Sequence, residues 1–480
     1  MPEPRPSRSS FQTYLFIALV AVELLMSFTF LGYLHVQPIS ITFAYIPPIL
    51  AGCLLRPVQA TVLGAVFGLA SLFKASSSYV MPMDQLFSPF RSGAPMASLI
   101  LSVGTRTLFA LLIGLALLWC RKRRHPRLWM ILPAALAPKL HAGLVYLAMG
   151  TFFPQTGYRW TRVICLDLSD VTISLVCVVL SQPAWHVYHL PAVENFRLYV
   201  DQSVHDSQWD RRLYRAWTIF VLMLVAAAAA SVIYFAQRIG YMLGQHGLVL
   251  TDEMNYDLVH LQVQFLAAAL SLNLIMALSL MAVYKYLSYR EYLGALDGLT
   301  GVMGRRMFLN HCQRLQQKGG LTQGWFLFAD VDYFKSINDA YGHPAGDQVL
   351  IQVARQLEMR FAPYGRVGRM GGDEFAVMVE QPLALDQLTA LLDGFLAEIN
   401  GVLPRQKPVS CSIGVCRFSF PQDVQALYTQ TDDVLYAAKH SGRGRYAISD
   451  LTDQGLVPLF PATETKQETK RSRRAFPAAP

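Results

Sequence analysis

The chain has 480 residues, of which 53% are apolar and 15% carry a charge. Because about 25% charged residues is typical of soluble globular proteins, this composition excludes a disordered chain and argues against a purely soluble one. Lys and Arg exceed Asp and Glu by 41 − 32 = 9, an excess that fits the cytoplasmic loops of a membrane protein better than nucleic-acid binding. The seven cysteines form no Cys-x-x-Cys pair and predict free thiols.

Apolar runs dominate the first 284 residues and are long enough for membrane-spanning helices of about 20 residues each. The first run follows Arg5 and Arg8 and is too long for the core of a signal peptide. Eight spans are expected, at residues 11–33, 37–55, 57–76, 96–120, 127–153, 163–185, 216–236 and 261–284. With the N-terminus inside, this even number leaves the basic runs 121–124 and 211–215, and everything after 285, on the cytoplasmic side.

Several charged residues fall within these spans, where a charge is costly and usually faces the interior of a helix bundle or a cavity. Two readings stay open: the charges pair with one another, or they line a ligand pocket. The residues are Glu23, Arg106, Lys139, Asp167 and Asp170, with His141 beside Lys139.

Residues 45–73 carry small side chains at Gly52, Gly64 and Gly68, which let membrane helices approach closely. This stretch resembles the substrate-capturing S components of energy-coupling-factor vitamin transporters, although Arg56 stands where those proteins have a glycine before the proline. The resemblance implies a bundle that senses a small-molecule ligand. It also leaves open a transporter whose C-terminal domain only regulates transport.

The composition of the chain becomes that of an ordinary soluble domain after about residue 297. We expect a membrane sensing bundle of about six helices at 1–190, a cytoplasmic linker at 191–215, and two membrane helices at 216–284 with a short outer loop at 237–260. A signalling helix at 285–296, a soluble domain at 297–449 and a disordered tail at 450–480 are expected to follow.

The soluble domain has a mixed α/β pattern. An apolar run predicts a strand at 325–330, and the helical spacing of Val349, Leu350, Val353 and Leu357 predicts a helix at 345–361. A glycine pair within 365–380 marks a hairpin between two strands. A helix, a strand, a helix and a strand are then expected at 386–400, 408–418, 423–440 and 445–448.

Three segments of this domain carry candidate chemistry: FADVDYFKSINDAYGHPAGD at 328–347, RMGGDEF at 369–375 and AAKHSGRGR at 437–445. Asp330 and Asp373 together predict a two-carboxylate Mg²⁺ site completed by substrate phosphates and water. The basic residues of the third segment suit phosphate oxygens. The sequence has no GxxxxGK[ST] motif, which excludes a P-loop nucleotide site.

These spaced motifs together resemble the GGDEF-domain diguanylate cyclases over residues 297–449. The resemblance implies a ferredoxin-like α/β core related to adenylyl cyclases and polymerase palm domains. The opening segment LDGLTGVMGRR at 296–306 matches the start of the family pattern, with Val302 and Gly304 in place of the usual Leu and Asn. We expect Asp297 to fix this turn with Arg305 or Arg306.

The resemblance also implies roles at individual positions. Asp330, the carbonyl of Val331 and Asp373 would bind Mg²⁺, with Mn²⁺ as an alternative, and Asp373 would help to deprotonate the attacking 3′-hydroxyl. Lys335 would stabilise charge on the phosphoryl group, and Glu374 is a further catalytic candidate. The substrate-binding candidates are Asn338, His343, Asp347, Lys439, Arg443, Gly371 and Gly372.

The reaction implied is condensation of two GTP molecules into cyclic di-GMP and pyrophosphate, and it requires a homodimer because each domain holds one GTP. The implied setting is the bacterial inner membrane with the GGDEF domain in the cytoplasm, and the implied partners include the lipid bilayer and downstream cyclic di-GMP receptors, but no nucleic acid. The Arg-x-x-Asp product-inhibition motif is replaced by Ala-Pro-Tyr-Gly at 362–365, which predicts no product inhibition there. The alternative is a non-catalytic nucleotide-binding membrane receptor.

Overall fold

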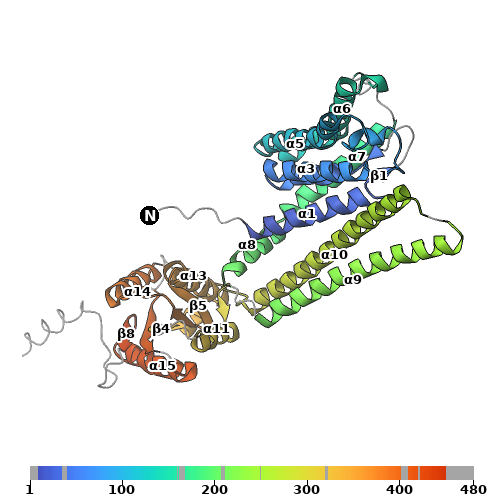
Figure 1. Cartoon of the computed structure of the whole chain (residues 1–480). Helices are drawn as coiled ribbons and strands as arrows, with labels where there is room; N and C mark the ends of the chain where they lie inside the picture. The colour runs from blue at the N-terminus through green and yellow to red at the C-terminus, as the bar shows by residue number, and fades with distance from the viewer. Residues whose placement is uncertain are drawn as a thin grey trace, which may run out of the picture. The chain divides into compact units, whose positions relative to one another are not determined.

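The computed structural model describes residues 9–34, 41–158, 161, 168–206, 211–248, 250–318, 323–401, 409–419 and 422–449. Arg5, Arg8, Asp167 and the predicted tail 450–480 lie outside these ranges. The chain divides into two compact units, Met1–Tyr289 and Arg290–Pro480. Each unit is described below by itself (Figure 1).

The first unit is almost entirely helical. Seven of its described helices are long and apolar enough to cross a membrane by length and composition, which is compatible with a membrane domain. The helices are α1 (Ser10–Phe28), α2 (Ile46–Leu54), α3 (Pro57–Lys74), α4 (Pro95–Leu99), α5 (Thr105–Arg121), α6 (Pro126–Phe152), α7 (Leu168–Tyr188), α8 (Pro191–Asp206), α9 (Arg211–Gln245) and α10 (Asp252–Ala295). Short elements join them: β1 (Tyr33–Leu34), β2 (Ile41–Thr42), η1 (Asp84–Phe87), the π-helical η2 (Ile100–Gly104) and η3 (Pro154–Thr156).

The predicted membrane-spanning helix at 37–55 is wrong in the part that the structure describes. There the chain forms β2, which pairs with β1, and then only the nine-residue α2. Two prolines occupy the first turn of α2, where their missing N–H groups cost nothing, and Pro57 disfavours helical geometry at Arg56. Proline placement therefore divides this apolar run into a short hairpin and a half-length helix.

The hairpin and α2 nevertheless return the chain to the end of the bundle at which α1 begins. Arg121, at the end of α5, donates from Nη2 to the carbonyl of Gly52 in α2 at 2.6 Å, and its guanidinium lies 5.6 Å from the ring of Trp185 in α7. Phe11 in α1 contacts Tyr188 at the end of α7, with ring centroids 6.3 Å apart. The start of α1 and the ends of α2, α5 and α7 therefore meet at one end of the bundle.

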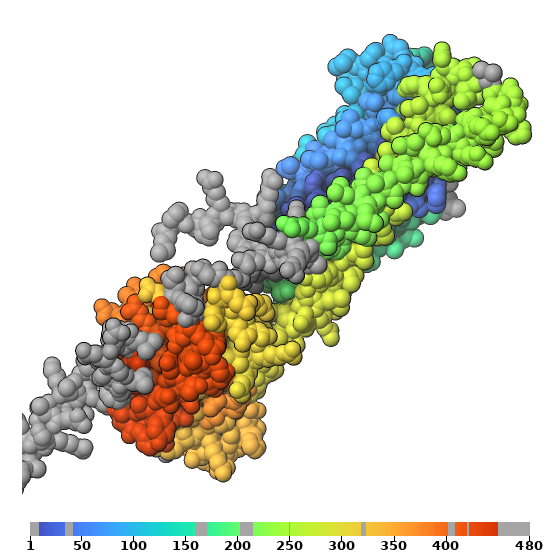
Figure 2. All heavy atoms as spheres, turned by 60° about the horizontal axis from the view of Figure 1, so that its bottom comes forward, coloured from blue at the N-terminus to red at the C-terminus, as the bar shows by residue number. Residues whose placement is uncertain are grey.

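The last two helices of the first unit are long and antiparallel. Helix α9 lies at the surface of this unit along its length, where Figure 2 shows it in green to yellow-green. The outer loop expected at 237–260 is mostly helical, since α9 continues to Gln245 and α10 begins at Asp252. The helix expected at 285–296 is the continuation of α10 and ends at Ala295.

The second unit is a six-stranded mixed sheet with helices on both faces, which fits the α/β prediction. Strand order is β3-β5-β6-β4-β7-β8, in which β3–β5 and β7–β8 are parallel and the other pairs antiparallel. The strands are β3 (Met303–Gly304), β4 (Gln323–Val331), β5 (Gly365–Gly371), β6 (Glu374–Val379), β7 (Cys411–Ser419) and β8 (Tyr446–Ser449). The helices are α11 (Arg305–Lys318), α12 (Phe334–Tyr341), α13 (His343–Phe361), α14 (Leu385–Ile399) and α15 (Val424–His440).

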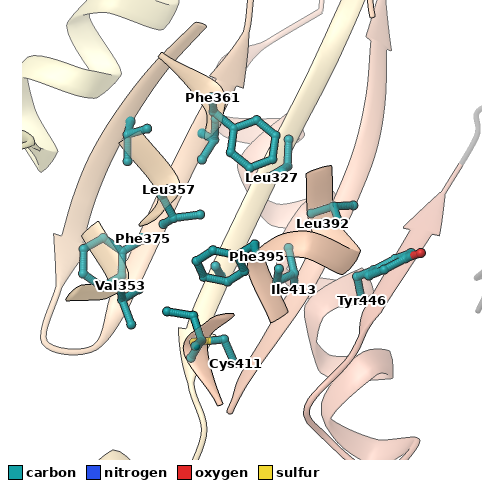
Figure 3. Packing of buried hydrophobic residues seen from close by; sticks show 14 of the residues in the cluster. Leu327, Val353, Leu357, Phe361, Phe375, Leu392, Phe395, Cys411, Ile413 and Tyr446 are labelled. Carbon is teal, nitrogen blue, oxygen red and sulfur yellow. The ribbon is translucent and has the colours of Figure 1, made fainter. Parts of the chain in front are cut away.

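The central strand β4 divides two hydrophobic cores because successive side chains point to opposite faces. Leu327 and Ala329 pack under α13 and α14, and Phe326 and Phe328 pack under α11 and α15. Figure 3 shows the first core, in which side chains of α13 and α14 meet those of the sheet: Val353, Leu357, Phe361, Leu392 and Phe395 against Leu327, Phe375, Cys411, Ile413 and Tyr446. These cores fix β4 and β6, whose ends carry the predicted acids.

Candidate active site

The acidic residues meet where β4 ends beside the start of β6. Asp330 and Glu374 are direct partners across the two strands, and the amide of Val331 donates to the carbonyl of Asp373 at 3.2 Å. Lys439, in the last turn of α15, places Nζ 2.9 Å from Oδ2 of Asp330. The structure thus brings together Asp330, Val331, Asp373, Glu374 and Lys439 from three separate segments of the chain.

The electrostatics of this edge are dominated by negative charge. Burial, together with Asp373 and Asp332, raises the pKa of Asp330 above its ordinary value, although Lys439 opposes the shift. Burial also raises the pKa of Glu374, and Asp330 and Asp373 add to that effect. Since one lysine does not offset several carboxyl groups, a bound cation would be favoured here.

The donor set at this edge fits Mg²⁺ or Mn²⁺, which prefer carboxylate and carbonyl oxygens. Among the described residues, no group of three or more His, Cys, Asp or Glu side chains has the arrangement of a complete metal site. Asp330, Asp373 and the Val331 carbonyl would therefore hold the ion only with oxygens from substrate and water, as Mg²⁺ in nucleotide sites commonly requires.

The glycine hairpin positions Asp373 and Glu374. Gly372 has φ +49°, in the left-handed region that favours glycine, and the register of β5 with β6 shifts between Arg369 and Gly371. Arg369 donates from Nε and Nη2 to the carbonyl of Gly372 at 3.0 and 2.6 Å. The arginine thus fixes the backbone immediately before Asp373.

The same arginine corrects the expected partner of Asp297. Nη1 of Arg369 lies 2.9 Å from Oδ1 of Asp297, which also accepts from the amide and hydroxyl of Thr300, whereas the expectation named Arg305 or Arg306. Burial by itself would raise the pKa of Asp297, but these hydrogen bonds and the charge of the arginine lower it below its ordinary value. The strand register explains the error: β3 pairs with β5 and brings Gly304 opposite Arg369, so that β5 supplies the cation.

The predicted guanine-binding residues lie around the junction of α12 and α13. Oδ1 of Asn338 is buried and has no hydrogen-bond partner among the described residues, although this group ordinarily accepts one. Gly346 leaves room for it, because a Cβ at that position would lie 2.0 Å from Oδ1 of Asn338. His343 and Asp347 are exposed in the first turns of α13, and Lys335 is exposed in the first turn of α12.

The predicted phosphate-binding residues lie where α15 passes into β8. Arg443 has φ +61°, an uncommon conformation for a residue with a side chain. Its guanidinium lies 4.8 Å from the ring centroid of Tyr333, and Nη1 lies 3.4 Å from the tyrosine hydroxyl. Tyr333 also has a positive φ, +55°, and belongs to the segment that follows Asp330.

The sequence reasoning missed Asp332, which lies between the acidic edge and this turn. Its carboxyl accepts from the Ser410 hydroxyl at 2.7 Å, the Ser412 hydroxyl at 2.7 Å and the Gly444 amide at 2.9 Å. The Asp-Val-Asp alternation at 330–332 was the available signal, since alternate residues of an extended strand point the same way. Arg369 was missed as well and had no local signal beyond its place before the glycines.

Comparison with known proteins agrees with this geometry. Residues 294–445 match the model of the family described as "Diguanylate cyclase, GGDEF domain". Diguanylate cyclase DgcM of Escherichia coli strain K12 is 36% identical over 155 residues, which cover 31% of this chain and 37% of DgcM. Diguanylate cyclase DgcS of Shewanella oneidensis is 34% identical over 158 residues, which cover 32% of this chain and 52% of DgcS.

The family model matches residues within the second unit. The matches span about a quarter to a half of the length of the curated relatives. Among solved structures, the coiled coil and GGDEF domain of DgcB from Caulobacter crescentus in complex with c-di-GMP is similar at 24% identity and a TM-score of 0.32, over 36% of this chain and 93% of that one. By the match to the family model, residues 294–445 are a GGDEF domain.

Proposed function

We propose that the full chain is a membrane-anchored diguanylate cyclase that condenses two GTP molecules into cyclic di-GMP and pyrophosphate. The observation that carries the proposal is the intact acidic edge, in which Asp330, Asp373 and Glu374 lie beside Lys439 within a domain that matches the cyclase family. The relatives named diguanylate cyclase support the same activity. The proposal also includes the relationship of this fold to adenylyl cyclases and polymerase palm domains.

The residues of the edge would act mainly by position and charge. Asp373 would accept the proton of the attacking 3′-hydroxyl, and Lys439 and Arg443 would neutralise phosphate oxygens. Lys335, exposed on α12, would reach the phosphoryl group on which charge develops. A Mg²⁺ ion held by Asp330, Asp373 and the Val331 carbonyl would supply Lewis-acid stabilisation of the phosphates.

Recognition of the base would fall to Asn338 and Asp347. The unpartnered Oδ1 of Asn338 supports this role, because an acceptor left without a donor inside a protein costs about 1–3 kcal/mol. A donor on the edge of guanine would satisfy it. Since each domain would hold one GTP, the active form would be a homodimer in which two such sites face each other.

The first unit supports the proposed membrane setting. Its long apolar helices support a multi-pass anchor in the bacterial inner membrane. The return of α2, α5 and α7 to the end where α1 begins supports an even number of crossings, which would put the N-terminus and the GGDEF domain on the same, cytoplasmic side.

A small polar ligand inside the bundle is a further part of the proposal. Lys139 pairs with Asp170 at 2.5 Å, as the internal-pairing reading expects. Oε2 of Glu23, Nε of Arg106 and Nε2 of His141, in contrast, are buried and have no hydrogen-bond partner in the part of the chain that the structure describes. This supports a bound ligand that supplies the missing hydrogen bonds. Mass spectrometry of molecules released from purified full-length protein should find one that Arg106→Gln protein lacks; wild-type protein that releases none contradicts this part.

Equilibrium binding and turnover of GTP by full-length protein in nanodiscs test the main proposal. Wild-type protein should bind GTP and convert it in the presence of Mg²⁺, whereas Asp373→Ala protein should lose turnover by at least about 1000-fold. Asp386→Ala, an exposed acid in the first turn of α14, is the matched control and should keep wild-type turnover. GTP binding without turnover in an enforced wild-type dimer would instead identify a nucleotide-binding receptor.

A further inference from the structure

Asp332 is a buried acid that the proposed chemistry does not use. Its side chain is 0% exposed, yet it lies between Val331 at the acidic edge and Tyr333 beside Arg443. A carboxyl group in such a place is costly unless its oxygens accept hydrogen bonds. Three hydrogen bonds to the Asp332 carboxyl meet this requirement.

The first two hydrogen bonds join Asp332 to the start of β7. The Ser410 and Ser412 hydroxyls donate to opposite oxygens, Oδ2 and Oδ1, both at 2.7 Å. The Asp332 amide in turn donates to the Ser410 carbonyl at 2.9 Å. Asp332 is therefore fixed in one rotamer from both sides.

The third hydrogen bond reaches the turn that leads from α15 into β8. The Gly444 amide donates to Oδ2 of Asp332 at 2.9 Å, directly after Arg443. Three consecutive residues of this turn have positive φ: Gly442 at +121°, Arg443 at +61° and Gly444 at +60°. A backbone in this region is retained only where its surroundings hold it, and for Arg443 that costs about 1–3 kcal/mol.

This turn positions Arg443, whose side chain is 42% exposed and lies beside the ring of Tyr333. Its Nε forms an ion pair with Oδ1 of Asp332 at 4.0 Å, too long for a hydrogen bond, and its Nη1 donates to the Tyr333 hydroxyl at 3.4 Å. Asp332 thus holds the backbone of the Arg443 turn and accepts no hydrogen bond from the guanidinium.

We propose that Asp332 is a positioning residue for triphosphate binding, which clamps the turn 441–445 to the end of β4 so that Arg443 faces the phosphates beside Asp330. This role rests on the proposed function, because it presupposes GTP as the substrate. The Asp332 carboxyl accepts hydrogen bonds from Ser410, Ser412 and Gly444 and, in the described part of the chain, from none of the base-binding residues of α12 and α13. Its loss should therefore act on the phosphates and spare the guanine.

The test compares nucleotides that differ only in phosphate number. Full-length protein in nanodiscs with Mg²⁺ is titrated with GTP and GMP, as wild type, Asp332→Asn and the Asp386→Ala control. Asn keeps the shape of the side chain but removes its negative charge and turns one acceptor oxygen into a donor, which weakens the charge-assisted hydrogen bonds that the Gly444 amide and the two serines donate to it. We expect the Kd for GTP to rise at least tenfold, the Kd for GMP to change less than twofold, and the control to match wild type.

Equal loss of affinity for GTP and GMP, or no loss for either, would overturn the proposal. If Asp332→Asn protein does not fold, Ser410→Ala removes a single donor and leaves the carboxyl in place; it should show the same selective loss for GTP at a smaller size, and an unselective effect would refute the role. Wild-type protein that fails to bind GTP at all would instead refute the proposed function, so the two failures are distinguishable.

Discussion

Replacing Arg369 should reduce cyclase turnover with little effect on the overall fold. The arginine joins Asp297, in the turn after α10, to the carbonyl of Gly372, immediately before Asp373. The side chains of Arg369 and Asp297 are only 13% and 24% exposed, so water replaces the ion pair between them poorly, whereas the hydrogen bonds to Gly372 are exposed. A hydrogen bond that involves a charged group contributes about 1.5–3 kcal/mol. If all of this free energy serves to position Asp373, its loss lowers the rate by about 10- to 150-fold.

The assay is GTP turnover by full-length protein, with the melting temperature measured alongside. Arg369→Lys is the matched variant, because it keeps the charge near Asp297 but lacks the planar fork that serves two acceptors. It should be nearly as defective as Arg369→Gln. Since both residues belong to one network, Asp297→Asn combined with Arg369→Gln should lose less activity than the two single losses multiplied. Independent effects of the two variants, or turnover of Arg369→Gln protein within threefold of wild type, would refute this reasoning.

Three further predictions concern the site itself. Gly346→Ala should raise the KM for GTP at least tenfold because its Cβ would displace Asn338, and an unchanged KM in steady-state kinetics would contradict the role of that amide. Lys439→Met should move the acidic limb of the kcat/KM pH profile to higher pH, because Lys439 lowers the pKa of Asp330 and its removal leaves only the influences that raise it; a limb that stays in place would contradict this. Glu374→Gln should raise the melting temperature of nucleotide-free protein more at pH 8 than at pH 5, because a carboxyl whose folded pKa is raised loses its favourable contribution as pH rises through that value; a pH-independent difference would argue against it.

Periodicity and turn chemistry predicted most of the second unit. The helix expected at 345–361 is α13 at His343–Phe361, and the hairpin expected around the glycine pair joins β5 to β6. These elements are set by local patterns of apolar residues and glycine. Helix α11 and the short β3 were not predicted, since α11 is largely polar and β3 has only two residues.

The membrane unit was less predictable because hydropathy reports composition rather than backbone path. Residues 37–55 are apolar enough for a span, yet their prolines leave the described part with a nine-residue helix. For both α9 and α10, hydropathy placed the start too late and the end too early, because each helix continues well beyond its apolar centre. Helical polar segments do not differ from loops on a hydropathy scale.

The residues of the candidate site also differ in how far the sequence predicts them. Residues in dense motifs, such as Asp330, Asp373 and Lys439, were predicted as site residues from the sequence, and the fold brings them together. Asp332 and Arg369 could not be assigned from the sequence because their partners lie about 80 and 70 residues away, and only strand register brings those partners into contact. Supporting residues of this kind are defined by tertiary contacts rather than by local pattern.

The measurement that tests the central claim most directly is identification of the product. Full-length protein in nanodiscs is incubated with GTP and Mg²⁺, and the nucleotides are quantified by mass spectrometry beside the Asp373→Ala variant. We predict one cyclic di-GMP and two pyrophosphates for every two GTP consumed by wild type, and none from the variant. GTP left intact by dimeric wild-type protein, or a product that forms equally with Asp373→Ala, would contradict the account.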